Sequence, residues 1–423
     1  MGEPPPPTGP GSGPFRILRS PNFRRLWVGA VTSALGTSVG TIVLLWIVYQ
    51  STDSPLAISF LGIVQFLPTL VFGLLAGALI DRLDRRRLML VCDVGRAACF
   101  GMLALLIVLV GVNLPIVLAI VFAVATFSTV FRPATNAAVP RILGPAELSD
   151  GNGLLQGGTT VAQFVGSPLG GIFLLSAGAA LGLAFNALTF ALSGVLIFLM
   201  VIPPGARPAG TAPPARRSLL GDVADGLRFV RAQPALLTIT GTAMAANFFL
   251  SIWGGFTVVY AADQLHVGAT GFSLLLAANT AGFAIGAILP GRLGLDRTPG
   301  RWLLPTWGPT GLCLVGLAAT DSLAIASALT LAVGVLLSMG NTVFLVGVQR
   351  SVPDEYLGRY FATDEAGSFA MIPAGLAVGG ILALDLGIGW TYLLAGVGSL
   401  VVNTPLFLSR SVRTWGRVAD RPT

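Results

Sequence analysis

Long apolar stretches, separated by short polar breaks, run along the chain from residue 26 to residue 408. A membrane-spanning helix needs about 20 apolar residues, and backbone in lipid must be helical or form a closed barrel. Apolar runs of this length favour helices. The pattern therefore predicts twelve membrane-spanning helices, at residues 26–49, 56–80, 88–111, 115–138, 154–177, 181–203, 235–260, 271–291, 302–320, 323–347, 361–384 and 388–408.

The longest polar break, residues 204–234, separates six predicted spans from the other six. The segments we expect are a Pro/Gly-rich tail at 1–14, a six-helix bundle at 15–203, a linker at 204–234, a second six-helix bundle at 235–410 and a tail at 411–423. Apolar residues at helical spacing in the linker predict an amphipathic helix on the membrane surface. They are Leu219, Leu220, Val223, Leu227 and Val230.

The two halves of the chain repeat each other weakly. Gly77-Ala78-Leu79-Ile80 is followed 209 residues later by Gly286-Ala287-Ile288-Leu289, and Val139-Pro140 is followed 213 residues later by Val352-Pro353. Both offsets are close to half the chain length, which predicts parallel repeats related by an axis along the membrane normal. We therefore expect an all-α membrane protein built from two pseudo-symmetric six-helix bundles.

Composition supports the membrane prediction independently. Only 10% of residues are charged and 54% are hydrophobic, with a mean hydropathy of +0.82, which excludes a soluble domain of this size. The 54 glycines are typical of transmembrane helices that pack closely through small residues. The three cysteines lie inside apolar runs and His266 is the sole histidine, so we expect no cofactor, no metal centre and no histidine-based proton relay.

The charged residues are unevenly distributed between the loops. All 25 basic residues are arginines, and each borders an even-numbered loop or a terminus, except Arg96 within the third span. By the positive-inside rule, this predicts a multi-pass protein of the cell inner or plasma membrane with both termini in the cytoplasm. The net charge of +7 follows from topology and does not indicate nucleic-acid binding. The opposite loops hold Asp53, Asp263, His266, Asp321 and Asp385.

Between the second and third spans the chain reads G-A-L-I-D-R-L-D-R-R-R-L, residues 77–88. This segment resembles the signature loop between helices 2 and 3 of the major facilitator superfamily, whose usual pattern is G-x-L-A-D-R-x-G-R-R-x-L. The resemblance implies a secondary transporter in which Asp81 and the arginines form a gate. Ile80 and Asp84 depart from the pattern; the matching residues are Gly77, Leu79, Asp81, Arg82, Arg85, Arg86 and Leu88.

Further segments, in the expected order along the chain, resemble the drug-exporter branch that includes macrolide-efflux and enterobactin-exporter proteins. They are residues 15–36, 131–140, 226–234 and 352–359. The last segment contains Gly358 and Arg359, which the resemblance assigns to the gate. The resemblance implies the major facilitator fold and export by alternating access, and it implies that the protein is not an enzyme.

Residues 166–171 partly resemble the Gly-Pro-x-x-Gly-Gly motif of antiporters, with Ser167 in place of a glycine. Two interpretations are open for this bend. It either aids helix packing alone, or seals the cavity against leak and so favours exchange. The residues concerned are Gly166, Pro168, Gly170 and Gly171. Branch members commonly carry an acid after the glycine of helix 1, whereas here Thr37 follows Gly36.

Two pairs of charged residues lie within predicted spans, where charge is costly and therefore a functional candidate. Asp93 and Arg96 are at i and i+3 on one helix face, and form either a neutral structural pair or a proton-coupling site in which Asp93 accepts the proton. Asp364 and Glu365 point about 100° apart, so we expect at most one of them to face a cavity and couple to protons. Their alternative role is pairing with Arg359 or other loop arginines.

Polar and aromatic residues within the spans are candidates for substrate binding by hydrogen bonds and stacking. Each is equally able to hold helices together. No ion pair is predicted at the membrane midplane, so the sequence favours a hydrophobic or weakly cationic organic substrate. The candidates are Thr41, Trp46, Gln65, Gln163, Asn247, Trp253, Asn279 and Asn341.

The sequence thus predicts a monomeric proton antiporter in the lipid bilayer that exports a hydrophobic or amphipathic small organic molecule, such as a drug or secondary metabolite. Siderophore export and lysolipid movement are alternatives within transporters. A non-transporting membrane sensor or scaffold is the alternative from another class, although a sensor would normally carry a soluble signalling domain. An intramembrane enzyme is disfavoured because the sequence shows no histidine cluster, no Ser/His pairing and no phosphate-binding loop with lysine.

Overall fold

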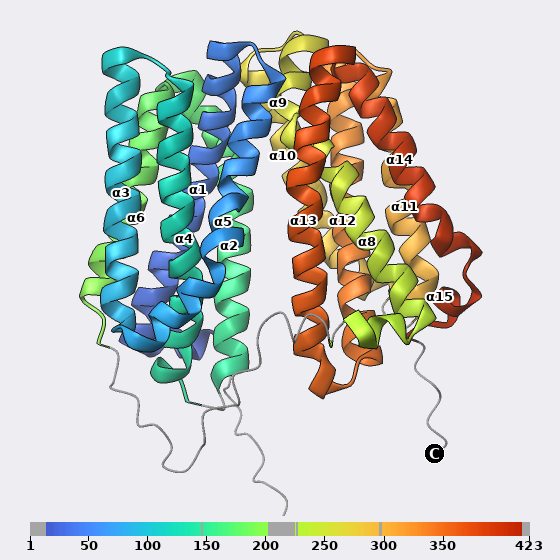
Figure 1. Cartoon of the computed structure of the whole chain (residues 1–423), viewed down its shortest axis with the longest axis horizontal. Helices are drawn as coiled ribbons and strands as arrows, with labels where there is room; N and C mark the ends of the chain where they lie inside the picture. Colours follow the sequence, from blue (N-terminus) through green and yellow to red (C-terminus); the bar gives the residue numbers. More distant parts are fainter. Residues whose placement is uncertain (1–13, 145–146, 202–224, 226, 296–297, 417–423) are drawn as a thin grey trace, which may run out of the picture.

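The computed structural model describes residues 14–144, 147–201, 225, 227–295 and 298–416, without the side chains of 14, 15, 73–82, 149, 354, 355, 362 and 369. Within these residues the chain forms two helical bundles that stand side by side (Figure 1). The first contains η1 (Pro14–Arg19), α1 (Pro21–Thr52), α2 (Pro55–Arg82), α3 (Arg85–Val110), α4 (Leu114–Ile142), α5 (Leu148–Ser176) and α6 (Ala179–Phe198). The second contains α8 (Pro234–Gly255), α9 (Thr257–Val259), the π-helical turn η3 (Tyr260–Gln264), α10 (Ala269–Leu293), α11 (Pro299–Ala318), α12 (Leu323–Ser351), α13 (Asp354–Leu386), α14 (Ile388–Leu408) and α15 (Arg410–Thr414).

The long helices correspond one to one with the predicted spans. Among the described residues, 11 helices are long and apolar enough to cross a membrane. The remaining long helix, α11, carries Arg301, Pro305 and Pro309 within its 20 residues, yet it packs against α12 and α14 inside the second bundle. The predicted all-α fold with two six-helix bundles is therefore confirmed.

The same packing partners recur in both bundles. In the first bundle α1 packs against α5 and α6, α3 packs against α4 and α6, and α2 packs against α4. The second bundle repeats this order: α8 packs against α13 and α14, α11 against α12 and α14, and α10 against α12. The bundles meet where α2 contacts α13 and where α5 contacts α10. The pseudo-symmetry that relates the two bundles also relates these two contacts to each other.

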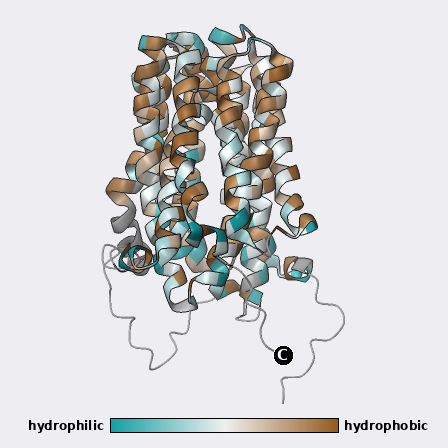
Figure 2. Cartoon of the chain, turned by 90° about the vertical axis from the view of Figure 1, so that its right-hand side faces the viewer, coloured by the Kyte–Doolittle hydropathy of each residue, from teal (hydrophilic) through white to brown (hydrophobic). Residues whose placement is uncertain are grey.

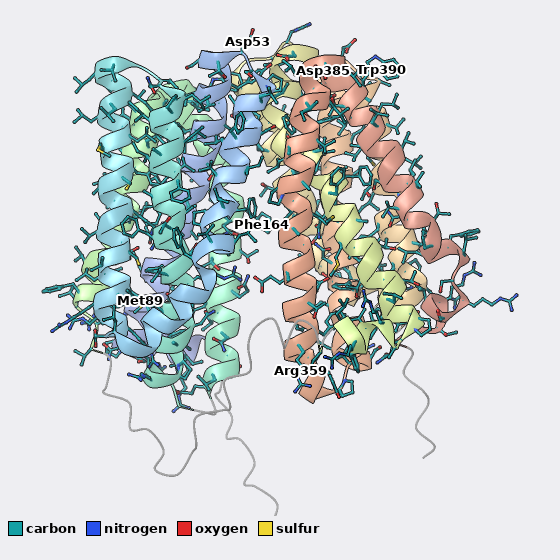
Figure 3. The ribbon with its side chains drawn as sticks, viewed as in Figure 1. Asp53, Met89, Phe164, Arg359, Asp385 and Trp390 are labelled. Carbon is teal, nitrogen blue, oxygen red and sulfur yellow. The ribbon has the colours of Figure 1, made fainter. Side chains whose placement is uncertain are left out.

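The two ends of the bundles differ in charge. Asp53 and Asp385 lie at one end and Arg359 at the other (Figure 3). The second end also contains the last turns of α4 and α12, with Arg141 and Arg350. We call these the aspartate end and the arginine end.

The outer surface is apolar over most of the length of the helices (Figure 2). Side chains such as Val108, Leu109 and Leu408 are 67–69% exposed. Backbone groups are paired within each helix, and so many exposed apolar side chains are unfavourable in water but suited to lipid. The surface therefore agrees with a membrane-embedded protein.

The buried apolar side chains form one shared core and two separate ones. The shared core contains residues of both bundles, including Tyr49, Leu265 and Ile388 near the aspartate end. A second core, around Met89, belongs to the first bundle alone, and a third, around Trp415, belongs to the second bundle alone. The bundles are thus joined through apolar packing at the aspartate end and have independent cores at the arginine end.

Most of the predicted linker helix lies outside the described residues, as do the tails at 1–13 and 417–423. In the described part, Asp225 pairs with Arg228 at 2.9 Å and Val230 is buried in the core of the second bundle. The expected tail at 411–423 begins as packed structure, because Val412 and Trp415 are buried in the same core.

Candidate transport pathway

A cavity of about 740 Å³ lies on the first bundle, lined by side chains from α1, α3, α4 and α5. Its polar residues include a row on α5, at positions 152, 156, 159 and 163, whose spacing places them on one face of the helix. Phe131 and Leu155 contribute apolar wall, and Thr37, which follows Gly36, also lines the cavity. The row on α5 is Asn152, Gln156, Thr159 and Gln163.

Arg96 lines this cavity and carries the buried ion pair that the sequence predicted. Its guanidinium pairs with the carboxylate of Asp93, which is fully buried behind it. The guanidinium carbon lies 4.0 Å from the ring centre of Phe131 and 4.4 Å from that of Phe190, so two aromatic faces stabilise the cation. Gly194 of α6 lies beside Asp93, where a Cβ would make an ordinary van der Waals contact with the Cβ of Asp93 at 3.5 Å. Burial of both charges makes their mutual pairing essential, because removing one leaves the other uncompensated.

Arg132 also lines the cavity and reaches the other bundle. Its guanidinium lies 3.8 Å from the carboxylate of Glu365 on α13, and the two side chains are 73% and 56% exposed. Asp364 is half-buried beside the exposed Glu365, and neither acid is among the residues that line the cavity. The expected partner Arg359 instead stacks over the ring of Tyr356 at 5.2 Å.

The cavity is therefore more charged than the sequence indicated. Two arginines line the cavity, one paired within its own helix, as the sequence indicated, and one paired across the bundles. Sequence patterns missed the Arg132–Glu365 contact because these two residues are 233 positions apart in the chain.

The gate residues are described only in part. The side chains of Gly77, Asp81 and Arg82 lie outside the described residues, and Arg85 opens α3. Arg86 donates from Nε to the carbonyl of Ile197 at 3.1 Å and from a terminal nitrogen to that of Phe198.

The end of α6 is thus held by arginines of its own bundle. Arg25 donates to the carbonyl of Leu199 at 2.8 Å, which adds to the two bonds from Arg86. Cations at a helix C-terminus satisfy carbonyls that have no partner within the helix. Asp84, which departs from the family pattern, accepts from the backbone N–H of Arg87 at 2.8 Å and caps α3. Gly358, the other predicted gate residue, is exposed.

The antiporter-like glycines bring three helices together. Gly166 and Gly170 face α1, and Gly171 faces α10 of the other bundle, where a Cβ would lie 1.6 Å from Oγ of Ser273. Pro168 lies between them inside α5. These glycines allow close packing within the first bundle, and the last one also lies at the contact between the two bundles.

The same glycine spacing recurs 209 residues later in α13, at Gly375, Gly379 and Gly380. Gly380 faces α2 of the first bundle, where a Cβ would lie 1.8 Å from Oγ of Ser59. Sequence reasoning missed this second set, although its offset equals that of the Gly77 repeat. The two glycine–serine contacts are related by the pseudo-symmetry.

The predicted substrate residues are scattered, and of them only Gln163 lines the cavity. Trp46 and Trp253 are 8% exposed and belong to the shared core, where Trp46 stacks on Phe272 with ring centres 5.7 Å apart. Asn247 donates to the hydroxyl of Ser368 at 2.9 Å, which is the helix-joining role. The others are Thr41, which donates to the carbonyl of Thr37, half-buried Asn279, and exposed Gln65 and Asn341. The row on α5 was missed, although its helical spacing is visible in the sequence.

The aspartate end is closed by contacts between the bundles. Tyr49 of α1 donates its hydroxyl proton to Asp263 at 2.5 Å, and Ser59 of α2 donates to the carbonyl of Leu376 at 2.8 Å. Asp263 lies in the π-helical turn η3. That turn is fixed because Tyr260 and Gln264 donate to carbonyls at the end of α11, at 3.0 and 2.9 Å.

Comparison with known proteins agrees with this architecture. The family described as "Transmembrane secretion effector" (MFS_3) matches residues 12–422. Macrolide efflux protein A of Streptococcus pyogenes is 26% identical over 392 residues, covering 88% of this chain and 92% of that protein. Multidrug efflux pump Tap of Mycolicibacterium fortuitum is 25% identical over 391 residues, covering 90% and 94%.

Solved structures give the same fold. A bacterial homologue of the human lysosomal transporter Spinster, in an inward-facing and unoccupied conformation, matches with a TM-score of 0.71 at 15% identity, covering 97% of this chain and 100% of that one. The sequence relatives and the fold are those of transporters and not of enzymes. The chain therefore belongs to the transmembrane secretion effector family of the major facilitator superfamily.

Proposed function

We propose that the protein is a secondary active transporter that exports a hydrophobic or amphipathic small organic molecule, a drug or secondary metabolite, by proton antiport. The observation that carries this proposal is the asymmetry of the two ends. The bundles share an apolar core at the aspartate end, whereas a polar cavity lies on the first bundle, and its lining residue Arg132 pairs with Glu365 of the second bundle. The names of two sequence relatives, Macrolide efflux protein A and Multidrug efflux pump Tap, support the direction of transport.

The arginine end is the cytoplasmic end in this proposal. Arginines border the loops of that end, and positive loops are retained in the cytoplasm. The protein then spans the plasma membrane as a monomer with both termini inside. Its conformation corresponds to the state that loads substrate from the cytoplasm.

Release on the outside requires the aspartate end to open. The Tyr49–Asp263 hydrogen bond and the two glycine–serine contacts must then separate. At the same time the arginine end closes. The predicted gate residues in segments 77–86 and 358–359 then hold it closed through charge pairs between the bundles. A hydrogen bond to a charged group contributes about 1.5–3 kcal/mol, so such exchanges are sufficient to shift the balance between two states.

Proton coupling is assigned to Asp93. Its carboxylate is buried behind Arg96, which lines the cavity, so a proton on Asp93 would release Arg96 from its partner. Substrate and proton then compete through one guanidinium, which is the linkage that antiport requires. Asp364 and Glu365 are the second candidates for this role.

The test is an efflux panel in a host that lacks its own pumps, with and without a protonophore. We expect the chain to lower the accumulation of several hydrophobic or amphipathic compounds, and the protonophore to abolish this effect. A membrane-inserted protein that changes the accumulation of no compound would contradict export. Efflux that resists the protonophore would contradict proton antiport.

A further inference from the structure

We propose that the substrate of this cavity carries both a carboxylate and an ammonium group, which bind Arg132 of α4 and Glu365 of α13 respectively. This inference rests on the proposed function, because it names the chemical class of the exported molecule. It starts from an ion pair between the two bundles, since α4 belongs to the first bundle and α13 to the second (Figure 1).

The Arg132–Glu365 pair is long and solvated. The nitrogen and oxygen are 3.8 Å apart, and the side chains are 73% and 56% exposed. Exposed pairs of this kind contribute little to stability, because water screens the attraction and both long side chains lose rotamer freedom. Both charges therefore remain available to a ligand at small cost.

The charges around the pair are divided between the bundles. Arg96 and Arg132 line the cavity of the first bundle, and none of its described lining residues is an acid. Across the gap, α13 presents Glu365 with the half-buried Asp364 beside it. A ligand with an anionic and a cationic group matches this division, whereas a simple anion would face Glu365 and a simple cation would face Arg132.

The cavity beside Arg132 suits the uncharged part of an organic molecule. The row of amides and hydroxyls on α5 offers hydrogen bonds, and Phe131 with Leu155 offers apolar contact. Because the two charged groups belong to different bundles, a ligand that binds both would favour the approach of the bundles at the arginine end. Occupancy would then promote the change of access that export requires.

The experiment measures the binding of three forms of one scaffold to the purified full chain near neutral pH: biphenylalanine, its amide and its N-acetyl derivative. These are a zwitterion, a cation and an anion of almost equal size. We expect the zwitterion to bind about tenfold more tightly than either derivative, because it makes two charge-assisted contacts in place of one.

Two variants separate the two contacts. Arg132→Gln should weaken the binding of the zwitterion and of the N-acetyl anion about tenfold, since each charged contact contributes about one such factor in affinity. The binding of the amide should not change. Glu365→Gln should weaken the binding of the zwitterion and of the amide, and should leave the binding of the N-acetyl anion unchanged or make it tighter. Asp225→Asn, which removes an acid of an ion pair outside the cavity, is the matched control and should change none of the three.

Equal or undetectable binding of the three probes to the unmodified protein would overturn the inference. An equal loss of affinity for all three probes in both variants would also overturn it, because that pattern indicates that the Arg132–Glu365 pair is structural. If the protein exports the drug panel in a protonophore-sensitive way but binds the three probes equally, the proposed function holds and the inference of a zwitterionic substrate is rejected. Discrimination without efflux would retain the site and reject export.

Discussion

The aspartate end and the arginine end hold the same two bundles in opposite ways. At the aspartate end the bundles share an apolar core, stack Trp46 on Phe272 and join Tyr49 to Asp263. At the arginine end each bundle has its own core, and the described ion pair that crosses between them is exposed and 3.8 Å long. Closure therefore depends on close apolar packing at one end, whereas the other end offers charges to water and to ligands.

The closed end depends on small residues at two symmetric positions. Gly171 opposes Ser273, and Gly380 opposes Ser59, in contacts that leave no room for a Cβ. Transmembrane helices approach this closely only through small residues. The predictions below test this difference between the ends, from the largest expected effect to the smallest.

Replacing Gly171 with Leu should abolish export. The new side chain would occupy the position of Ser273 Oγ, so the aspartate end would be held open and the cycle would stop. We expect an efflux rate at least about 100-fold lower, which corresponds to about 2.7 kcal/mol, and faster labelling of a cysteine placed between the bundles at that end.

Gly268→Leu is the matched control, because a Cβ at this glycine of the same end meets no atom within 4 Å. It should leave efflux unchanged. Normal efflux by Gly171→Leu at equal expression would show that the glycine–serine contact does not form part of the cycle.

Asp93→Asn should remove protonophore-sensitive efflux and leave substrate binding measurable. The change preserves shape but leaves Arg96 with a buried, uncompensated charge, at a cost of about 3–5 kcal/mol. We expect active efflux to fall about tenfold or more. Thermal unfolding of the purified variant checks that the protein still folds.

Variants of the other candidate acids, Asp364 and Glu365, give the outcomes that would contradict proton coupling at Asp93. If Asp93→Asn pumps normally whereas Asp364→Asn or Glu365→Gln does not, the coupling site lies in the second bundle. If all three pump normally, the coupling ion is not a proton carried by these acids.

Tyr49→Phe should weaken the closed aspartate end without blocking it. The variant loses the hydroxyl that donates to Asp263 and retains the aromatic packing. Because Asp263 is exposed, we expect a loss of about 1 kcal/mol and about a fivefold shift toward opening at that end. Cysteine accessibility at Ser54 should rise by a similar factor, and an unchanged rate would mean that the hydrogen bond does not hold the end closed.

Single cysteines at the loops should not affect transport, and they test which end faces the cytoplasm. In a variant without the three native cysteines, Cys at Ser54, Gly268 or Ser322 should react with an impermeant reagent from outside intact cells. Cys at Gly144, beside Arg141 at the arginine end, should not. The reverse pattern would invert the orientation.

Sequence periodicity predicted the helices well because membrane insertion is governed by local properties. Runs of about 20 apolar residues suffice to predict a span, and α11 was found in this way despite two prolines and an arginine. The buried Asp93–Arg96 pair was also predictable, since its members are one helical turn apart.

Contacts between distant helices were not predictable in the same way. Trp46 was expected to bind substrate, but α10 places Phe272 over it at the closed end. The sequence offered Arg359 or other loop arginines as partners of Glu365, and the structure pairs it with Arg132. In each case the partner lies on a helix far away in the chain, and no local pattern specifies it.

The sequence by itself determined the twelve helices, their division into two repeats and the separation of arginines from aspartates, because apolar length and charge position act residue by residue during insertion. Only the tertiary structure decided which end is closed and which charges share the cavity. Those properties depend on how the bundles approach, and that approach is set by Gly171 against Ser273 and Gly380 against Ser59, contacts between residues more than 100 positions apart.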